Sequence, residues 1–231
     1  SLAIKAAEDF VHAGYPLDAE AILLCELDGT NAEVSEHILK VRDVLKRSGA
    51  NEVRTAKDEA ERQIFWQGRK AAFPAVGRIS PDYYCMDGTI PRKQLPLVLK
   101  TMAELSEQYQ LPVANVFHAG DGNLHPLILY DANVPGELER TEEFGGRILE
   151  LCVEVGGTIT GEHGVGMEKI DQMCVQFAPA ELSQFHAVKA AFDPQALLNP
   201  GKAVPTLHRC AEFGAMHVHK GELPFPDLER F

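Results

Sequence analysis

The chain has 231 residues, of which 45% are hydrophobic and 24% charged, a composition typical of a soluble globular protein. Its net charge of −12 and its lack of a Lys/Arg cluster argue against binding to nucleic acid or to an anionic membrane surface. No apolar run approaches the ~20 residues of a membrane-spanning helix. The five cysteines form no CxxC pair and show no regular spacing, which indicates reduced thiols and a cytoplasmic protein.

The N-terminal part of the chain is expected to combine helices with short strands. Apolar residues at helical spacing predict helices over residues 2–12, 31–45 and 56–69. Asn31 is a suitable N-cap for the second of these helices. The apolar run EAILLCELD at residues 20–28 predicts a buried strand, and residues 52–55 predict a short one.

From residue 81 onward, strands and helices alternate around a central hairpin. Residues 81–90 are expected to be extended, and residues 113–130 contain two β-prone runs. Helices are predicted over residues 94–109, 135–155, 170–177 and 180–192, with Pro179 starting the last. A tight hairpin cannot occur in an all-parallel sheet. The expected fold class is therefore α+β, an antiparallel sheet with flanking helices and an extended C-terminal tail.

The hairpin VANVFHAGDGNLHPLILY is the first candidate site. Asp121-Gly122 predicts a two-residue type I′ turn, which would place His118 directly opposite His125 with Cβ atoms ~5 Å apart. Two neutral imidazoles at that separation can bind one divalent metal. The alternative is a hairpin that carries two polar residues on a solvated face.

The glycine-rich loop TITGEHGVGMEK contains the second candidate group. Glu162 together with His118 and His125 makes a His/His/carboxylate set suited to Zn, Fe or Mn. Adjacent side chains diverge in an extended backbone, so His163 would stay free to act as a base beside the metal. The alternative is a glycine loop with exposed polar residues.

Two arginines and a turn complete the candidates. Arg69 and Arg78 could bind a substrate carboxylate bidentately, although a surface position is the common fate of an arginine. Asn199 lies in a tight NPGK turn. The tail has H-x-C and H-x-H spacings without a recognisable zinc pattern, at His208, Cys210, His217 and His219. No G-x-G-x-x-G follows a strand and no Walker A motif is present, which argues against nicotinamide and nucleoside triphosphate ligands.

The runs FHAGDGNLHPLI, GGTITGEHGVGMEK and FDPQALLNPGK resemble the C-terminal domain of FAD-linked oxidases that act on 2-hydroxy acids. This resemblance extends over residues 17–231, and WQGRKAAFPAVGRISPDYYCMDGTIPR is most similar to the FAD-linked subunits of the glycolate-oxidising branch. It implies a substrate domain over residues 1–206 and a tail over residues 207–231. It also implies an FAD-binding domain upstream, and the chain begins without a methionine, as expected of a piece of a longer protein.

The resemblance also implies roles for individual residues. His118, His125 and Glu162 match the metal ligands of metal-dependent members. His163 matches the base that takes the hydroxyl proton while hydride passes to the flavin. Arg69 matches a substrate-carboxylate ligand. Asn199 lies in the segment that returns to the flavin domain, which makes it a candidate for a cofactor contact.

The substrate implied is a small 2-hydroxy acid. Relatives specific for a dicarboxylate carry a lysine where this chain has Cys85, so glycolate, oxidised to glyoxylate, is favoured and D-lactate is the alternative. The expected partners are iron–sulfur and second flavin-type subunits, through which a cytoplasmic protein could attach peripherally to the inner membrane. Two other functions stay open, a stand-alone metal-dependent hydrolase and an assembly module whose tail docks a partner.

Overall fold

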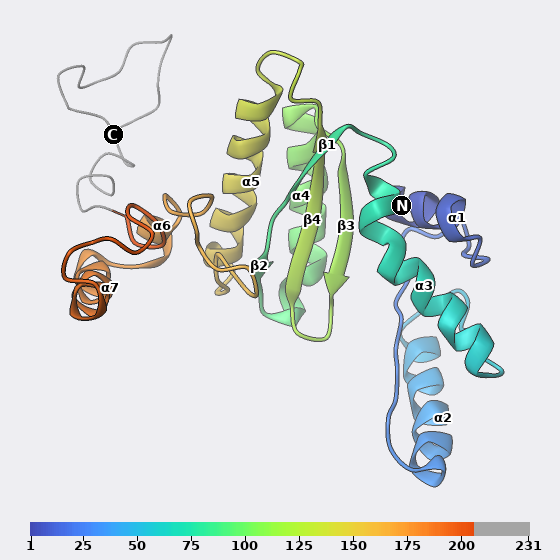
Figure 1. Ribbon diagram of the computed structural model, residues 1–231. Helices are drawn as coiled ribbons and strands as arrows, with labels where there is room; N and C mark the ends of the chain where they lie inside the picture. Colours follow the sequence, from blue (N-terminus) through green and yellow to red (C-terminus); the bar gives the residue numbers. More distant parts are fainter. Residues whose placement is uncertain (206–231) are drawn as a thin grey trace. The chain divides into compact units, whose positions relative to one another are not determined.

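The computed structural model describes residues 1–205, which divide into a first compact unit, Ser1–Ser80, and a second that begins at Pro81 (Figure 1). The expected domain over residues 1–206 stays a prediction. The expectations for residues 207–231, including the histidines and the cysteine of the tail, lie outside the described residues. In residues 1–205, no helix combines the length and the apolar character needed to cross a membrane.

The first unit is built from helices α1 (Leu2–Val11), α2 (Asn31–Arg47) and α3 (Glu59–Val76). Helix α1 packs against α3. The Tyr15 hydroxyl donates a hydrogen bond to the backbone carbonyl of Phe65 in α3, which ties the segment after α1 to that helix. The buried apolar residues of this small core are Ile4, Ala7, Ala13 and Tyr15.

Three expectations for the first unit are wrong, namely two strands and one helix cap. Residues 20–28 and 52–55 form no strand, and Leu23 is 58% exposed where a buried strand was expected. The described part of this unit contains no strand, so neither run has a neighbouring strand with which its backbone N–H and C=O groups could form a ladder. The N-cap of α2 is Thr30, whose backbone N–H donates to the Glu33 carboxylate (2.8 Å) in a reciprocal capping box.

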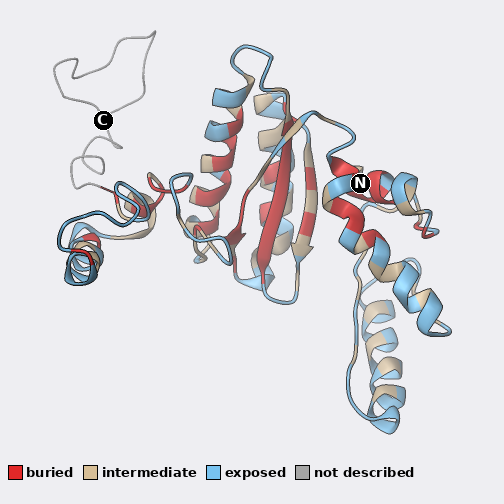
Figure 2. Ribbon diagram, in the orientation of Figure 1, coloured by how far each residue is buried: buried red, intermediate tan, exposed pale blue. Residues whose placement is uncertain are grey.

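The second unit contains a four-stranded antiparallel sheet centred on β4 (Asn123–Tyr130). Strands β1 (Asp82–Cys85) and β2 (Gly88–Thr89) pair with one edge of β4, and β3 (Val113–His118) pairs with the other. Figure 2 shows β4 as buried along most of its length. The α+β architecture with an antiparallel sheet is therefore confirmed.

Helices flank this sheet, as expected (Figure 1). The helices are η1 (Arg92–Gln94, a 3-10 turn), α4 (Leu95–Tyr109), α5 (Glu137–Glu154), α6 (Met173–Gln176) and α7 (Pro179–Phe192). Helices α4 and α5 cover one face of the sheet. Their buried side chains and those of β4 form one core, which includes Val98, Met102, Leu124, Ile128, Phe144 and Ile148. A second core joins α5 to α6 and α7.

The hairpin differs from the expected two-residue turn. His118 lies opposite Asn123, and the connection is a four-residue loop over residues 119–122. The backbone N–H of Asp121 donates to the carbonyl of His118 (3.1 Å), so the tight turn starts earlier than the Asp-Gly pair suggests. Within this loop only Gly122 has a positive φ, of 75°, and a Cβ on it would lie 2.1 Å from the Ile90 carbonyl oxygen. Glycine is thus required at residue 122 on both counts.

The corrected register still keeps the two histidines on one face of the sheet. A shift of one residue would send His118 and His125 to opposite faces, but the observed shift is two residues. They are diagonal neighbours instead of a direct pair.

The cysteines follow the expectation in part. Cys25, Cys85 and Cys152 are free thiols, and Cys152 is buried. Cys174 is disulfide-bonded, so the expectation of reduced thiols is wrong at that position.

Candidate active site

Four of the predicted site residues meet at one end of the β3–β4 hairpin. His118 ends β3, His125 lies in β4, and Glu162 and His163 lie in the glycine-rich loop. The His118 and His125 ring centroids are 5.5 Å apart, and those of His125 and His163 are 5.3 Å apart. His125 Nε2 lies 3.5 Å from Glu162 Oε2. Residues separated by up to 45 positions in the chain are thus brought into one cluster.

Burial divides this cluster into a fixed centre and an accessible rim. His125 is 3% exposed because it lies in the central strand, whereas the Glu162 side chain is 54% exposed. His118 and His163 are also exposed. One imidazole is therefore held by the sheet, and the groups around it are open to a ligand.

The donor chemistry of this cluster fits a divalent metal. His118, His125 and Glu162 each offer one ligand atom, and these atoms lie within 4.8 Å of one another. Two imidazole nitrogens and a carboxylate oxygen are a donor set found with Zn, Fe and Mn. Asp87, His125 and His163 form a second such group in the described part of the chain, so His125 is common to both.

The electrostatics of His125 favour the neutral ring. Burial lowers its pKa below the ordinary value, and the nearby rings of His163 and His118 act in the same direction. Glu162 and Asp87 oppose this shift without cancelling it. A neutral imidazole is the form that binds a metal.

Asp87 is a central residue of the site that sequence reasoning did not assign to it. It lies between β1 and β2 and is fully buried. Its Oδ2 accepts hydrogen bonds from consecutive backbone amides of the loop, at 3.1 Å from Gly161, 2.9 Å from Glu162 and 2.7 Å from His163. The same oxygen lies 3.2 Å from Lys169 Nζ.

These donors keep Asp87 ionised. Burial by itself would raise the pKa of this carboxyl, but the amides of His163 and Glu162 and the Lys169 ammonium hold it below its usual range. The Thr160 hydroxyl, which donates to Oδ2 at 2.9 Å, contributes in the same direction. The only local signal in the sequence is Asp87-Gly88, which reads as a turn.

Asn123 is a second residue of the site that was not predicted. Its Nδ2 lies 3.4 Å from His125 Nε2, and within residues 1–205 its buried Oδ1 has no hydrogen-bond partner. A Cβ on Gly161 would lie 2.7 Å from that Oδ1. Glycine at residue 161 therefore lets the loop approach Asn123 closely.

The other predicted site residues, Arg69, Arg78 and Asn199, do not belong to this cluster. Arg69 is half-buried on α3, and Arg78 is exposed with its guanidinium carbon 5.2 Å from the centroid of the Phe10 ring. Both belong to the first unit. Asn199 lies in a turn with a φ of 45°, and its backbone carbonyl accepts a hydrogen bond from the Lys202 N–H at 3.2 Å. The roles of all three residues stay predictions.

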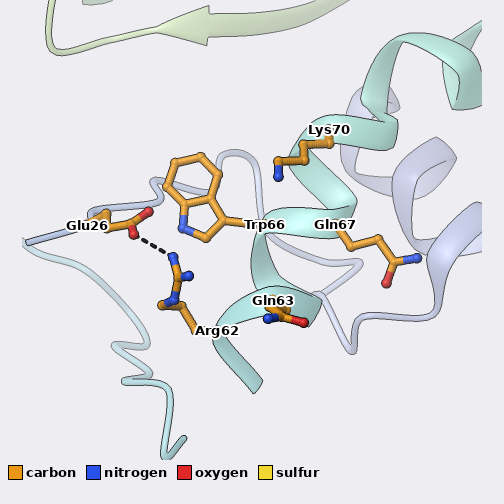
Figure 3. Close-up of a pocket in the computed structure, with 6 residues that line it drawn as sticks. All are labelled: Glu26, Arg62, Gln63, Trp66, Gln67 and Lys70. Carbon is orange, nitrogen blue, oxygen red and sulfur yellow. Dashed lines mark hydrogen bonds and ion pairs between the residues drawn. The ribbon is translucent and has the colours of Figure 1, made fainter. Parts of the chain in front are cut away.

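The first unit also contains a pocket of about 570 Å³ (Figure 3). Its lining residues are Glu26, Arg62, Gln63, Trp66, Gln67 and Lys70. Arg62 forms an ion pair with Glu26 across it. None of the predicted site residues lines this pocket.

Comparison with known proteins identifies the family. The family described as FAD linked oxidases, C-terminal domain, matches residues 1–203, and the chain belongs to it. Glycolate oxidase subunit GlcD of Escherichia coli strain K12 is 72% identical over 231 residues, which are all of this chain and 46% of that protein. The corresponding subunit of Bacillus subtilis is 37% identical over 84% of this chain and 42% of its own length.

More distant relatives agree with this assignment. A probable mitochondrial D-lactate dehydrogenase of Danio rerio is 30% identical over 87% of this chain and 40% of its own length. The solved structure of 4-ethylphenol oxidase from Gulosibacter chungangensis covers 78% of this chain and 38% of that chain, with a TM-score of 0.56 and 16% identity. At that identity the likeness supports the fold alone. The chain spans less than half the length of these curated relatives.

Proposed function

We propose that this chain forms the substrate-binding part of an FAD-dependent 2-hydroxy-acid dehydrogenase that oxidises glycolate to glyoxylate. The observation that carries the proposal is the meeting of His118, His125, Glu162 and His163 in a domain of an FAD-linked oxidase. The 72% identity to a glycolate oxidase subunit over the whole chain supports glycolate as the substrate.

In this proposal His118, His125 and Glu162 would hold a divalent metal, because their ligand atoms are close and His125 is kept neutral. The metal would supply a positive charge that lowers the pKa of the substrate hydroxyl. The exposed carboxylate of Glu162 would add negative charge to the set of ligands.

His163 is proposed to take the hydroxyl proton. The flavin, when bound, supplies the acceptor for the hydride that leaves the α-carbon. His163 suits the role of base because its ring is exposed and stacks 5.3 Å from the buried His125 ring, while its backbone N–H is fixed by Asp87.

The arginines are proposed to bind the substrate carboxylate. Arg69 would bind it through two parallel N–H groups, and Arg78 would serve as a second cation. Asn199 is proposed to contact the cofactor from its turn. The assignments of Arg69 and Asn199 rest on the resemblance of the sequence runs that contain them, and that of Arg78 rests on the bidentate affinity of arginine for a carboxylate.

A small substrate is supported by Cys85. Burial raises the pKa of this thiol to about 11, so it is neutral and offers no cation to a second carboxylate. Glycolate and D-lactate both satisfy this condition, and relatives named D-lactate dehydrogenases make D-lactate the alternative substrate.

The proposed partners are further subunits that accept electrons from the flavin. The relatives at 72% and 37% identity are named as subunits of a glycolate oxidase. We infer that iron–sulfur and second flavin-type subunits complete the complex. We also infer that the protein is cytoplasmic and that any attachment to the inner membrane is peripheral and occurs through these subunits.

The proposal is tested with the flavoprotein that contains this chain, using dye reduction with glycolate, D-lactate and D-2-hydroxyglutarate. Glycolate is expected to give the highest kcat/KM. Arg69→Ala should raise KM, whereas Arg47→Ala, an exposed arginine paired with Asp43 in α2, should not. Preference for the dicarboxylate would refute the substrate assignment, and hydrolysis of an ester panel without acid oxidation would favour a hydrolase.

A metal assay tests the ligand assignment separately. His118→Ala should lose bound metal, while His37→Ala, an exposed histidine on α2, should retain it. Equal metal content in the two variants would remove His118 from the ligand set.

A further inference from the structure

His125 is shared by two groups that could hold the same ion. The first group adds His118 and Glu162, and the second adds Asp87 and His163. Binding of the metal by the first group and binding by the second have different chemical consequences, because a metal in the second group would be coordinated by His163, the imidazole that is proposed to act as the base. The chain therefore needs a feature that favours the first group.

Asp87 is already engaged by other donors. Its Oδ2 accepts from three backbone amides and from the Thr160 hydroxyl, and its Oδ1 lies 3.1 Å from the Glu162 N–H. A carboxylate offers about four lone-pair positions. The loop therefore uses the lone pairs of Oδ2, and Oδ1, with a single contact at 3.1 Å, is the oxygen left to meet an ion.

Lys169 adds a charge to this arrangement. Its Nζ lies 3.2 Å from Asp87 Oδ2 and 3.1 Å from Thr160 Oγ1, and the residue is 1% exposed. An ammonium so enclosed cannot move aside into solvent. A divalent cation that approached Asp87 would meet this fixed positive charge in a site of low dielectric constant.

We propose that Lys169, by binding Asp87, selects the metal site. The ion is directed to His118, His125 and Glu162, and His163 stays outside the coordination. This inference rests on the proposed function, since it concerns the metal and the base of that same site. Lys169 and Asp87 are positioning residues, because neither is assigned a contact with substrate.

The same arrangement explains how one carboxylate orients two functional side chains. Asp87 holds the consecutive amides of Glu162 and His163, so the backbone from which both side chains project is fixed against β1 and β2. Lys169 lies at the far end of the loop, and its contact closes that loop over Asp87. The choice of the residues that bind the metal and the placement of the base thus both depend on the contact between Lys169 and Asp87.

The test measures zinc affinity in the flavoprotein that contains this chain, by equilibrium titration with Zn²⁺ alone. His118→Ala is expected to weaken zinc binding at least 10-fold. Adding Lys169→Met should restore binding by 10-fold or more, because Asp87, His125 and His163 become available together. Adding Asp87→Asn to that double variant should abolish the restored binding.

The control is Lys169→Arg, which keeps the positive charge and should not restore zinc binding to His118→Ala. Restoration by arginine as well as by methionine would overturn the proposal, as would no restoration by Lys169→Met or no zinc binding by the parent protein. Lys169→Gln replaces Lys169→Met, with the same outcomes, if the latter does not retain FAD. Zinc affinity is read without turnover, so a failure of glycolate as substrate is recognised independently in the dye assay.

Discussion

The ion pair between Asp87 and Lys169 gives the sharpest prediction for stability. Both residues are buried, at 0% and 1% exposed, and their charged atoms are 3.2 Å apart. Asp87→Asn preserves the volume but leaves the Lys169 ammonium without a counter-charge, which typically costs ~3–5 kcal/mol. Lys169→Met should cost less, ~1.5–3 kcal/mol, because Asp87 keeps the three amides and the Thr160 hydroxyl as donors.

A double-mutant cycle checks this asymmetry. Urea unfolding of the parent, the two single variants and the double variant gives the four free energies of unfolding. The double variant should lose less than the sum of the single losses, since it no longer contains an unpaired buried charge. Additive losses, or a loss of less than ~1 kcal/mol in Asp87→Asn, would refute this account of the pair.

The difference in free energy of unfolding between the parent and Asp87→Asn should depend on pH in a definite direction. The pKa of Asp87 in the folded protein is below its usual range, whereas an unfolded aspartate has a pKa of ~3.9. Its contribution to the free energy of unfolding is therefore complete above about pH 5 and is lost only as the pH falls below ~4 toward the folded pKa. The parent and Asp87→Asn should thus differ by a constant amount between pH 5 and 7 and converge in stronger acid.

Three further predictions concern the hairpin, the core and the thiols. In urea unfolding, Gly122→Ala should destabilise the protein by at least ~1–2 kcal/mol, whereas Asp121→Ala should change the free energy of unfolding by no more than ~0.5 kcal/mol. The reason is that, of these two residues, only Gly122 has a positive φ. Equal costs would instead support a type I′ turn, in which both residues have a positive φ. Phe144→Ala should cost ~3–5 kcal/mol in the same assay, because this α5 side chain is fully buried and stacks on Tyr109 of α4, and a loss below ~1 kcal/mol would contradict that packing. Iodoacetamide should label exposed Cys25 before Cys152, whose pKa is raised by burial to about 12, as read by peptide mass spectrometry; faster labelling of Cys152 would refute its burial.

The hairpin shows how much of the site the sequence could predict. Alternating polar and apolar residues define which side chains share a face, so His118 and His125 could be placed together without knowledge of the loop. The loop length could not be read from Asp121-Gly122, because an Asp-Gly pair is compatible both with a two-residue turn and with a four-residue loop that has one glycine in the left-handed region. The predicted register was wrong by two residues, an even number, so His118 and His125 still lie on the same face of the sheet and in the same site.

Asp87 shows where reasoning from the sequence ends. Its donors lie 73 to 82 residues further along the chain, and nothing local distinguishes it from other turn aspartates. Likewise, the apolar run at residues 20–28 has strand character, but a strand forms only where another strand supplies hydrogen-bond partners, and the first unit has none within the described residues. Both features are decided by tertiary contacts.

The most direct test of the central claim is the reduction of the flavin by glycolate under anaerobic conditions. This half-reaction needs no partner subunit, and loss of the oxidised-flavin absorbance follows it in a stopped-flow instrument. The parent flavoprotein and His37→Ala should be bleached at the same rate, whereas His163→Ala should be ~10²–10⁴-fold slower, the usual contribution of a general base. Bleaching of His163→Ala at the parental rate would contradict the assignment of the base, and no bleaching of the parent by glycolate would contradict the proposed activity.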